Sequence, residues 1–268
     1  MPNPVYLGMS GTEGGSGGGM TSSEGGAESS SSSAAIGTGD GDGTTTSTDG
    51  LPTSADASSS EGGSGELGEA CPDDDTLSLC LLFDVDDPTG VVDESSYANP
   101  VTIDGGSLID SPWTRAFSFD VTTQFAVDCP EACVGGEQVS FEAWLWLEES
   151  PDGRSGIVDQ NGLLGAFVTE EMALRCNSQG GAAEGGTVPL RAWVHVACVA
   201  DGEVLLAYID AELVDEREIN PLTPVGQPQL AIGNDSPSFG EPLLGALDRV
   251  RVWNRALSPA QVAQAATP

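Results

Sequence analysis

The chain has 268 residues, of which 42 are acidic and eight are basic, and its formal net charge is −34. This balance argues against a nucleic-acid partner, because binding to phosphate requires lysine and arginine side chains to replace condensed counterions. It also argues against adhesion to an anionic membrane surface, and the sequence contains no run of 18 apolar residues for direct membrane insertion.

Residues 1–70 differ in composition from the rest of the chain. They contain ten acidic residues and no basic ones, and they are rich in glycine, serine and threonine with only scattered apolar residues. Such a segment buries too little apolar surface to offset its loss of conformational entropy. We therefore expect a disordered acidic tether with a root-mean-square span of roughly 45 Å. Its first seven residues show neither the charged start nor the apolar core of a signal peptide.

From residue 71 onward, short runs of β-branched and aromatic residues alternate with turn signals, and we expect one domain over residues 71–268. The best amphipathic run is Gln138–Glu148, in which the odd positions are apolar and the even positions include Glu142, Trp144 and Trp146. In chain order, the predicted strands are Leu79–Val85, Ala116–Phe119, Gln124–Val127, Gln138–Glu148, Gly156–Val158, Leu163–Val168, Met172–Cys176, Trp193–Ala200, Val204–Ile209, Gln229–Ile232 and Ala246–Trp253.

A single helix is predicted near the end of the chain. Ser258 is a favourable N-cap and Pro259 a favourable first helical residue for a short helix that runs through Ala265. Many short strands with one terminal helix are typical of an all-β fold. The sequence therefore predicts an antiparallel β-sandwich of the jelly-roll type behind the tether.

All six cysteines lie in the predicted domain, and the chain has a single histidine. An even number of cysteines without Cys-x-x-Cys spacing argues against zinc and favours disulfides in an exported protein. Cys176 and Cys198 fall in successive predicted strands, which favours a cross-strand bridge between them. Cys129 and Cys133 flank a three-residue loop that a second bridge could close. Cys71–Cys80 is then the third pair by elimination. Six unpaired thiols in a cytosolic protein are the alternative.

Several segments resemble one known family when they are taken in order. A Trp-x-His-Val-Ala run begins at Trp193, a Tyr-x-Asp turn at Tyr208, and a Gly-x-x-Asp-x-Val-Arg-Val run at Gly245. Together with Val139–Leu145 and the Phe-Asp pair near Phe119, they resemble the laminin-G-like (concanavalin A-like) jelly-roll family over about residues 79–265. The resemblance implies a β-sandwich that usually presents a binding surface outside the cell.

The resemblance also implies a structural calcium site. In the family, the aspartate of the last long strand, here Asp248, often contributes to such a site near the first strand. We expect Asp248 and Asp84 as ligands and Asp93 as a third, with backbone carbonyls completing the shell. The alternative is that Asp248 pairs with Arg249 or Arg251, or accepts hydrogen bonds from backbone amides.

No catalytic residue is predicted. Some relatives hydrolyse β-glucans with a Glu-x-Asp-x-x-Glu strand that places carboxylates on one face, and this sequence has no such run. The only histidine, His195, stands where the family has a structural histidine. A Ser-His-Asp triad and a nucleophilic cysteine would both need this histidine, so neither is supported.

Tryptophans are the candidates for ligand contact. Trp144 and Trp146 lie on the same face of a predicted strand, roughly 7 Å apart, and aromatic faces at that spacing can stack on sugar rings. Trp113 is a further candidate. Trp144 aligns with a residue that is common throughout the family, which favours a packing role for it.

These features predict an extracellular or cell-surface protein whose tether carries a non-catalytic binding domain. The expected partner is a carbohydrate or an extracellular protein, with calcium as a structural aid. The alternatives are a glycoside hydrolase or polysaccharide lyase of the same fold, and a structural component of the cell surface.

Overall fold

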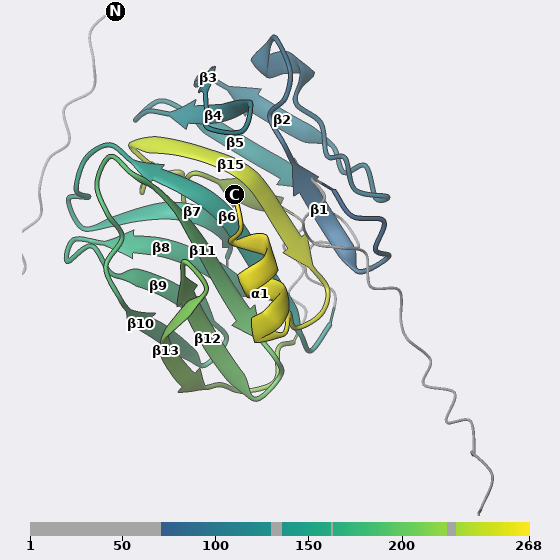
Figure 1. The fold of residues 1–268 in the computed structure, drawn as a ribbon, viewed down its shortest axis with the longest axis vertical. Coiled ribbons are helices and arrows are strands. Elements are labelled where there is room, and N and C mark those ends of the chain that lie inside the picture. The colour runs from purple at the N-terminus through teal and green to yellow at the C-terminus, as the bar shows by residue number, and fades with distance from the viewer. Residues whose placement is uncertain (1–70, 130–135, 162, 224–228) are drawn as a thin grey trace, which may run out of the picture. The chain divides into compact units, whose positions relative to one another are not determined.

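The computed structural model describes residues 71–129, 136–161, 163–223 and 229–268 (Figure 1). The chain divides into two units, Met1–Ala57 and Ser58–Pro268, and every described residue belongs to the second. The tether predicted for residues 1–70 lies outside the described residues. Within the described ranges, no helix is long and apolar enough to cross a bilayer.

The described residues form mainly β-strands, which confirms the predicted all-β class. In chain order the elements are β1 (Leu77–Leu81), η1 (Pro88–Gly90), β2 (Val101–Asp104), β3 (Ser107–Asp110), β4 (Arg115–Phe119), β5 (Gln124–Asp128), β6 (Val139–Leu147), β7 (Arg154–Gln160), β8 (Leu164–Thr169), β9 (Leu174–Ser178), β10 (Gly181–Gly185), β11 (Trp193–Ala200), β12 (Val204–Ile209), β13 (Glu212–Glu218), β14 (Gln229–Ile232), β15 (Gly245–Trp253) and α1 (Pro259–Ala265).

The strands form two antiparallel sheets that pack face to face as a sandwich. Sheet A has the order β13-β12-β11-β6-β15-β4-β3, and β1 pairs with β15. Sheet B has the order β10-β9-β8-β7-β14-β5-β2. One apolar core, to which both sheets contribute, lies between them. The predicted sandwich architecture is confirmed.

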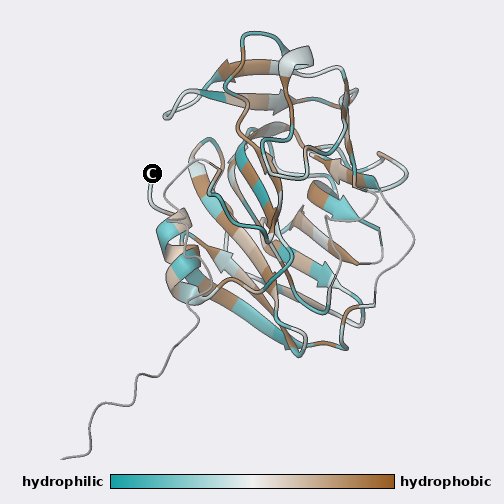
Figure 2. Cartoon of the chain, turned by 90° about the vertical axis from the view of Figure 1, so that its right-hand side faces the viewer, coloured by the Kyte–Doolittle hydropathy of each residue, from teal (hydrophilic) through white to brown (hydrophobic). Residues whose placement is uncertain are grey.

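Strand β6 shows why the two sheets pack together. Its odd-numbered residues, from Val139 to Leu147, are apolar and fully buried in the shared core. Its even-numbered residues, among them Glu142, Trp144 and Trp146, face away from that core, because successive side chains of a strand point to opposite faces. Figure 2 shows the resulting alternation of apolar and polar residues along the strands.

The C-terminal helix covers part of the outer face of sheet A. Val262 of α1 packs with Leu77, Tyr208 and Trp253 in a second, smaller apolar cluster. Ser258 caps the helix as predicted, since its hydroxyl accepts a hydrogen bond from the backbone N–H of Gln261 at 3.3 Å. The outer face of this sheet is therefore buried at one end and open at the other.

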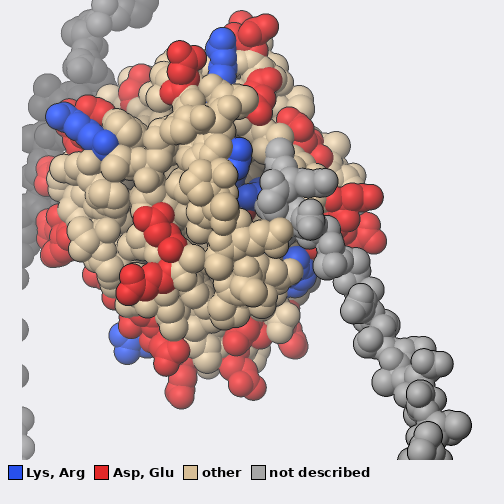
Figure 3. All heavy atoms as spheres, viewed as in Figure 1, with Lys and Arg blue, Asp and Glu red and all other residues tan. Residues whose placement is uncertain are grey.

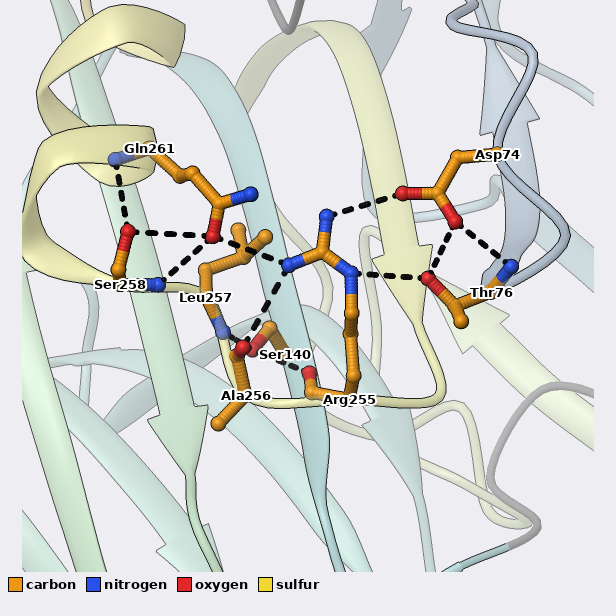
Figure 4. Close-up of polar contacts among 8 residues, drawn as sticks. All are labelled: Asp74, Thr76, Ser140, Arg255, Ala256, Leu257, Ser258 and Gln261. Carbon is orange, nitrogen blue, oxygen red and sulfur yellow. Dashed lines mark hydrogen bonds and ion pairs between the residues drawn. The ribbon is translucent and has the colours of Figure 1, made fainter. Parts of the chain in front are cut away.

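Arg255 ties this helix to the beginning of the domain (Figure 4). Its guanidinium donates to the Thr76 hydroxyl at 2.9 Å, to the Asp74 carboxylate at 2.9 Å and to the Gln261 side-chain oxygen at 3.0 Å. The backbone N–H of Asn254 also donates to the carbonyl of Thr76 at 2.8 Å. The first described strand and the last helix are thus held together at the same end of the sandwich.

At the opposite end of the sandwich, two of the connections that cross from one sheet to the other lie next to each other. One joins β6 to β7, and the other joins β14 to β15. They run side by side, because the N–H of Glu148 donates to the carbonyl of Leu244 at 2.9 Å and the N–H of Gly156 donates to that of Glu241 at 2.8 Å. These paired connections form a rigid edge between the outer faces of the two sheets.

Two of the three predicted disulfides are present among the described residues. Cys71 pairs with Cys80, and Cys176 pairs with Cys198. The predicted partner of Cys129, Cys133, lies outside the described residues, and Cys129 is itself disulfide-bonded. One detail differs from the prediction, because Cys176 belongs to sheet B and Cys198 to sheet A. The bridge therefore joins the two sheets across the core instead of neighbouring strands.

Candidate functional site

A hollow of about 280 Å³, here called the polar hollow, opens on the outer face of sheet B. Strands β7, β8 and β9 contribute its floor, and the connection between β14 and β15 contributes one wall. It is lined by Arg154, Asp159, Asn161, Leu163, Leu164, Gly165, Phe167, Asn177, Ser178, Asp235 and Ser236. Most of these side chains are polar, in contrast to the apolar core on the other face of the same strands.

Two glycines set how closely the wall approaches the floor. A Cβ atom at Gly156 would lie 2.4 Å from the backbone carbonyl of Asn234, so the wall rests directly on β7 only because this residue has no side chain. A Cβ atom at Gly165 would lie 2.6 Å from the Oδ1 atom of Asp159 and 2.7 Å from the Phe167 ring. The second glycine therefore leaves the floor open beside the carboxylate.

The hollow holds two carboxylates in different electrostatic states. Burial raises the pKa of Asp159 to about 6, and the neighbouring Asp235 charge adds to this, although the N–H of Ser236 donates to Asp159 at 2.8 Å. Burial also acts to raise the pKa of Asp235. Hydrogen bonds from the Ser238 hydroxyl and from backbone amides, including that of Glu241 at 2.9 Å, outweigh it and lower this pKa.

Arg154 is the one basic residue that lines the polar hollow. Its guanidinium lies over the Phe167 ring, 4.2 Å from the ring centroid, and forms two hydrogen bonds with the Glu241 carboxylate at 2.8 and 2.9 Å. The ion pair fixes the guanidinium, and the stacking buries the ring beneath it. The positive charge is therefore largely neutralised by Glu241.

The remaining polar groups of the hollow are suited to hydroxyl-rich molecules. The buried hydroxyl oxygens of Ser178 and Ser236 have no hydrogen-bond partner among the described residues. The amides of Asn161 and Asn177 can each donate and accept, and the Asp159 carboxylate accepts. Buried polar groups without partners are rare in folded proteins, so these hydroxyls indicate a site that a polar ligand or water completes.

The predicted tryptophans meet on the outer face of sheet A, next to one that the sequence analysis did not single out. The ring of Trp113 lies 4.5 Å from that of Trp144 and 5.6 Å from that of Trp193, and Trp146 lies 6.0 Å from Trp193. Trp144 is only 5% exposed, which favours a packing role for it, whereas the other three are partly exposed. Register explains the cluster, because Trp193 stands directly opposite Trp146 in the β6–β11 pair.

Of the three carboxylates expected to bind calcium, Asp93 has hydrogen-bond partners of its own. The buried Asp93 carboxylate already accepts five hydrogen bonds, from the backbone amides of Cys80, Ser95 and Asn99 and from the side chains of Ser95 and Asn99. These bonds saturate its lone pairs. Among the described residues there is no cluster of three His, Cys, Asp or Glu placed to hold a metal. The residues present do not fit a site with three carboxylates, and calcium stays a prediction.

Asp248 and Asp84 lie near one another on the outer face of sheet A, where Asp248 stands opposite Trp144 of β6. Asp248 is 1% exposed and accepts a hydrogen bond from the Ser111 hydroxyl at 2.8 Å, while Asp84 is exposed and bonds the Thr114 hydroxyl. Burial raises the pKa of Asp248 to about 6, and the Asp84 charge adds to the shift. Asp248 also accepts a hydrogen bond from the backbone of Arg249, and a bond from a backbone amide is one of the alternatives left open by the sequence.

His195 belongs to a buried charged cluster. Its Nε2 atom lies 2.9 Å from one carboxylate oxygen of Glu142, and the Nε atom of Arg251 lies 2.5 Å from the other. The three side chains are at most 2% exposed. Burial acts to raise the pKa of Glu142, but Arg251 and His195 hold it below its ordinary value. His195 thus lies in the interior of the domain, where a structural histidine is expected.

No motif or pattern in the sequence indicates the polar hollow. Its floor residues come from three strands, and Asp235 and Ser236 come from a connection that reaches β7 from 77 positions later in the sequence. These residues are far apart in the sequence, so no motif of fixed spacing contains them. The one signal in the sequence is the turn-forming run Asn234-Asp235-Ser236-Pro237, which marks a compact loop but not what the loop touches.

Solved structures with the same fold include several binding domains. The binding domain of Paraclostridial Mosquitocidal Protein 1 has a TM-score of 0.59 at 13% identity, covering 72% of this chain and 52% of that one. Domain 4 of AbnA, a GH43 extracellular arabinanase from Geobacillus stearothermophilus, was solved with arabinotriose and gives 0.58 at 16%, covering 72% and 98%. The binding domain of botulinum neurotoxin DC, solved with SialylT, gives 0.54 at 14%, covering 70% and 50%.

Sequence identities this low show that the fold is shared. This chain spans about half the length of the two toxin binding domains. Among curated proteins, none matches the sequence. A sequence model of the Concanavalin A-like lectin/glucanases superfamily matches residues 121–263, which is more than half of the 268 residues. The matched region runs from just before β5 into α1 and contains every strand of the polar hollow. The chain therefore belongs to the concanavalin A-like lectin/glucanases superfamily.

Proposed function

We propose that the domain is a non-catalytic carbohydrate-binding module that works outside the cell. The observation that carries this proposal is the polar hollow, where a half-buried carboxylate, two side-chain amides and two unpartnered hydroxyls surround one space of about 280 Å³. Few but convergent polar groups in a hollow are what a small hydroxylated ligand requires for orientation. The arabinotriose and SialylT bound to two proteins of the same fold support a sugar as this ligand.

The disulfides support the extracellular location. Cys71–Cys80 and Cys176–Cys198 would not persist in a reducing cytosol. The AbnA domain of similar fold belongs to an extracellular enzyme. Mass spectrometry of the unreduced native protein tests this point, and six alkylatable thiols would overturn it.

A glycan-array screen of the full chain, run once in calcium and once in EDTA, tests the proposed binding. We expect one class of glycan to bind, and Asp159→Asn to weaken that binding tenfold or more, because a hydrogen bond to a charged group is worth about 1.5–3 kcal/mol. Asp104→Asn, an exposed change on β2, is the matched control and is expected to bind like the wild type. Equal binding by both variants, or no binding by folded protein, would overturn the proposal.

One observation favours glycoside hydrolysis as a second candidate. The polar hollow contains one carboxylate whose pKa is raised to about 6 and another whose pKa is lowered, which is how acid and base roles are divided in many glycosidases. Against this, the Asp235 carboxylate is engaged by hydrogen bonds within its own loop. Release of reducing ends from mixed polysaccharides, abolished by Asp159→Asn, would establish the enzyme. We expect no release.

A further inference from the structure

A second hollow adjoins the polar hollow, and a third adjoins the second. The connecting hollow, of about 170 Å³, lies between the two connections that cross the end of the sandwich, and the tryptophan hollow, of about 280 Å³, lies on the outer face of sheet A. The connecting hollow is lined by Glu149, Pro151, Asp152, Arg154, Ser155, Gly240, Glu241, Pro242 and Leu244. The tryptophan hollow is lined by Ile109, Ser118, Phe119, Trp146, Glu148, Glu149, Leu244, Gly245 and Ala246.

The three hollows are contiguous because neighbours share lining residues. Arg154 lines both the polar and the connecting hollow, while Glu149 and Leu244 line both the connecting and the tryptophan hollow. The edge beneath them is held firmly, since the Ser155 hydroxyl donates to the carbonyl of Pro242 at 2.9 Å in addition to the backbone bonds between the connections. The three hollows therefore follow one another from the outer face of sheet B to the outer face of sheet A.

The two ends of the path offer complementary contacts to a sugar chain. At one end, the polar hollow offers hydrogen bonds to hydroxyl groups. At the other end, the partly exposed Trp146 offers an aromatic face, and its position is fixed because its Nε1–H donates to the Glu148 carboxylate at 3.1 Å. Sugars combine polar edges with apolar faces, so a chain several residues long can use both kinds of contact at once.

The negative charge of the three hollows favours neutral sugar chains over anionic ones. Carboxylates line all three hollows, including Asp159, Asp152 and Glu148, whereas Arg154 is the one basic lining residue, and it is paired with Glu241. On the face seen in Figure 3, acidic side chains are likewise spread widely and basic ones are few. An anionic polymer would be repelled along the whole path.

We propose that the three hollows form one binding path for an extended, neutral polysaccharide. This inference rests on the carbohydrate binding proposed above and adds the length and the charge of the ligand. A short oligosaccharide occupies the polar hollow alone. A longer chain passes over Arg154 and the connecting hollow and reaches Trp146 on the other sheet.

Calorimetric titration of the full chain tests the path. The probes are neutral arabinan, xylan and mixed-linkage β-glucan, each with its trisaccharide and hexasaccharide fragments, and polygalacturonate as an anionic polymer. For the neutral polymer that binds, we expect the hexasaccharide to bind at least about tenfold more tightly than the trisaccharide. Trp146→Ala is expected to remove this gain and to leave the trisaccharide unchanged, whereas Asn177→Ala weakens both.

A blocking variant separates loss of contact from loss of folding. Glu149 is an exposed loop residue, so Glu149→Trp fills the path without touching the core, and Glu203→Trp, on an exposed turn at the opposite end of the sandwich, is its control. Unchanged hexasaccharide binding by Glu149→Trp, with binding lost in Asn177→Ala, would overturn the path and leave the proposed function intact. Unchanged binding in Asn177→Ala would overturn the proposed function itself. Equal affinity for polygalacturonate would overturn the neutral ligand.

Discussion

The buried pair of Glu142 and Arg251 gives a direct test of the energetics of this sandwich. Glu142 is fully buried and Arg251 is 2% exposed, and their ion pair is 2.5 Å long. In Glu142→Leu, a side chain of similar size replaces the carboxylate, and both Arg251 and His195 lose it as a partner. Breaking a buried pair by removing one member costs about 3–5 kcal/mol, because the remaining charge stays in a low-dielectric interior.

For a domain of this size, each kcal/mol lowers the melting temperature by about 2–4 °C, so the expected loss is roughly 6–20 °C. Guanidinium denaturation at pH 7, followed by circular dichroism, measures the free energy directly. The double variant Glu142→Leu/Arg251→Met is expected to recover most of the loss, since replacing a buried pair by apolar residues is often neutral. A single variant that costs less than about 1 kcal/mol, or a double variant as unstable as the single one, would refute this reasoning.

Four further measurements test other features. The double variant Cys176→Ala/Cys198→Ala is expected to lose about 3 kcal/mol in denaturation, because the bridge spans 22 positions of the sequence; a loss below 1 kcal/mol would contradict this. The pKa of Asp248 is about 6 in the folded protein, against an ordinary value of 3.8, so the folded protein binds this proton more tightly than the unfolded chain does. The free energy of unfolding therefore falls as the pH rises from about 4 to 6. Asp248→Asn should therefore raise stability at pH 7 by up to about 3 kcal/mol and flatten the profile between pH 4 and 6; an unchanged profile would count against the shift. Arg255→Ala is expected to cost about 1–3 kcal/mol and to expose the C-terminal helix to proteolysis, and unaltered cleavage would show that the helix does not need this anchor. Calcium added to EDTA-treated protein is expected to leave the melting temperature unchanged, and a rise of several degrees would restore the calcium site predicted from the sequence.

Local patterns in the sequence predict the sandwich well. The alternation along Gln138–Glu148 gives both faces of β6 correctly, and the Asp201-Gly202 turn joins β11 to β12 as a hairpin. Strands without such alternation were missed, among them β10, which is Gly181–Gly185 and lacks large apolar residues. The first strand ends at Leu81, earlier than predicted, and the positive φ of 64° at Phe83 lies just beyond this end.

The site was harder to predict because its geometry is non-local. Trp144 is buried because Trp113, from the segment between β3 and β4, packs against it at 4.5 Å. Asp159 acquires its raised pKa because the connection after β14 covers it. Neither contact can be predicted from the residues adjacent to Trp144 or Asp159 in the sequence. Such burial depends on the packing of loops, which a periodicity of two does not encode.

The hydrogen bonds around Arg255 lie at the end of the sandwich remote from the three hollows. Thr76 and Asn254 meet beside the first residues of β6, whereas the three hollows adjoin the last residues of β6 and the start of β15. The nine residues of β15 separate these ends by roughly 27 Å. The chain thus enters the domain at the end remote from the hollows. A polymer that lies along the hollows would therefore not contact Thr76 or Arg255.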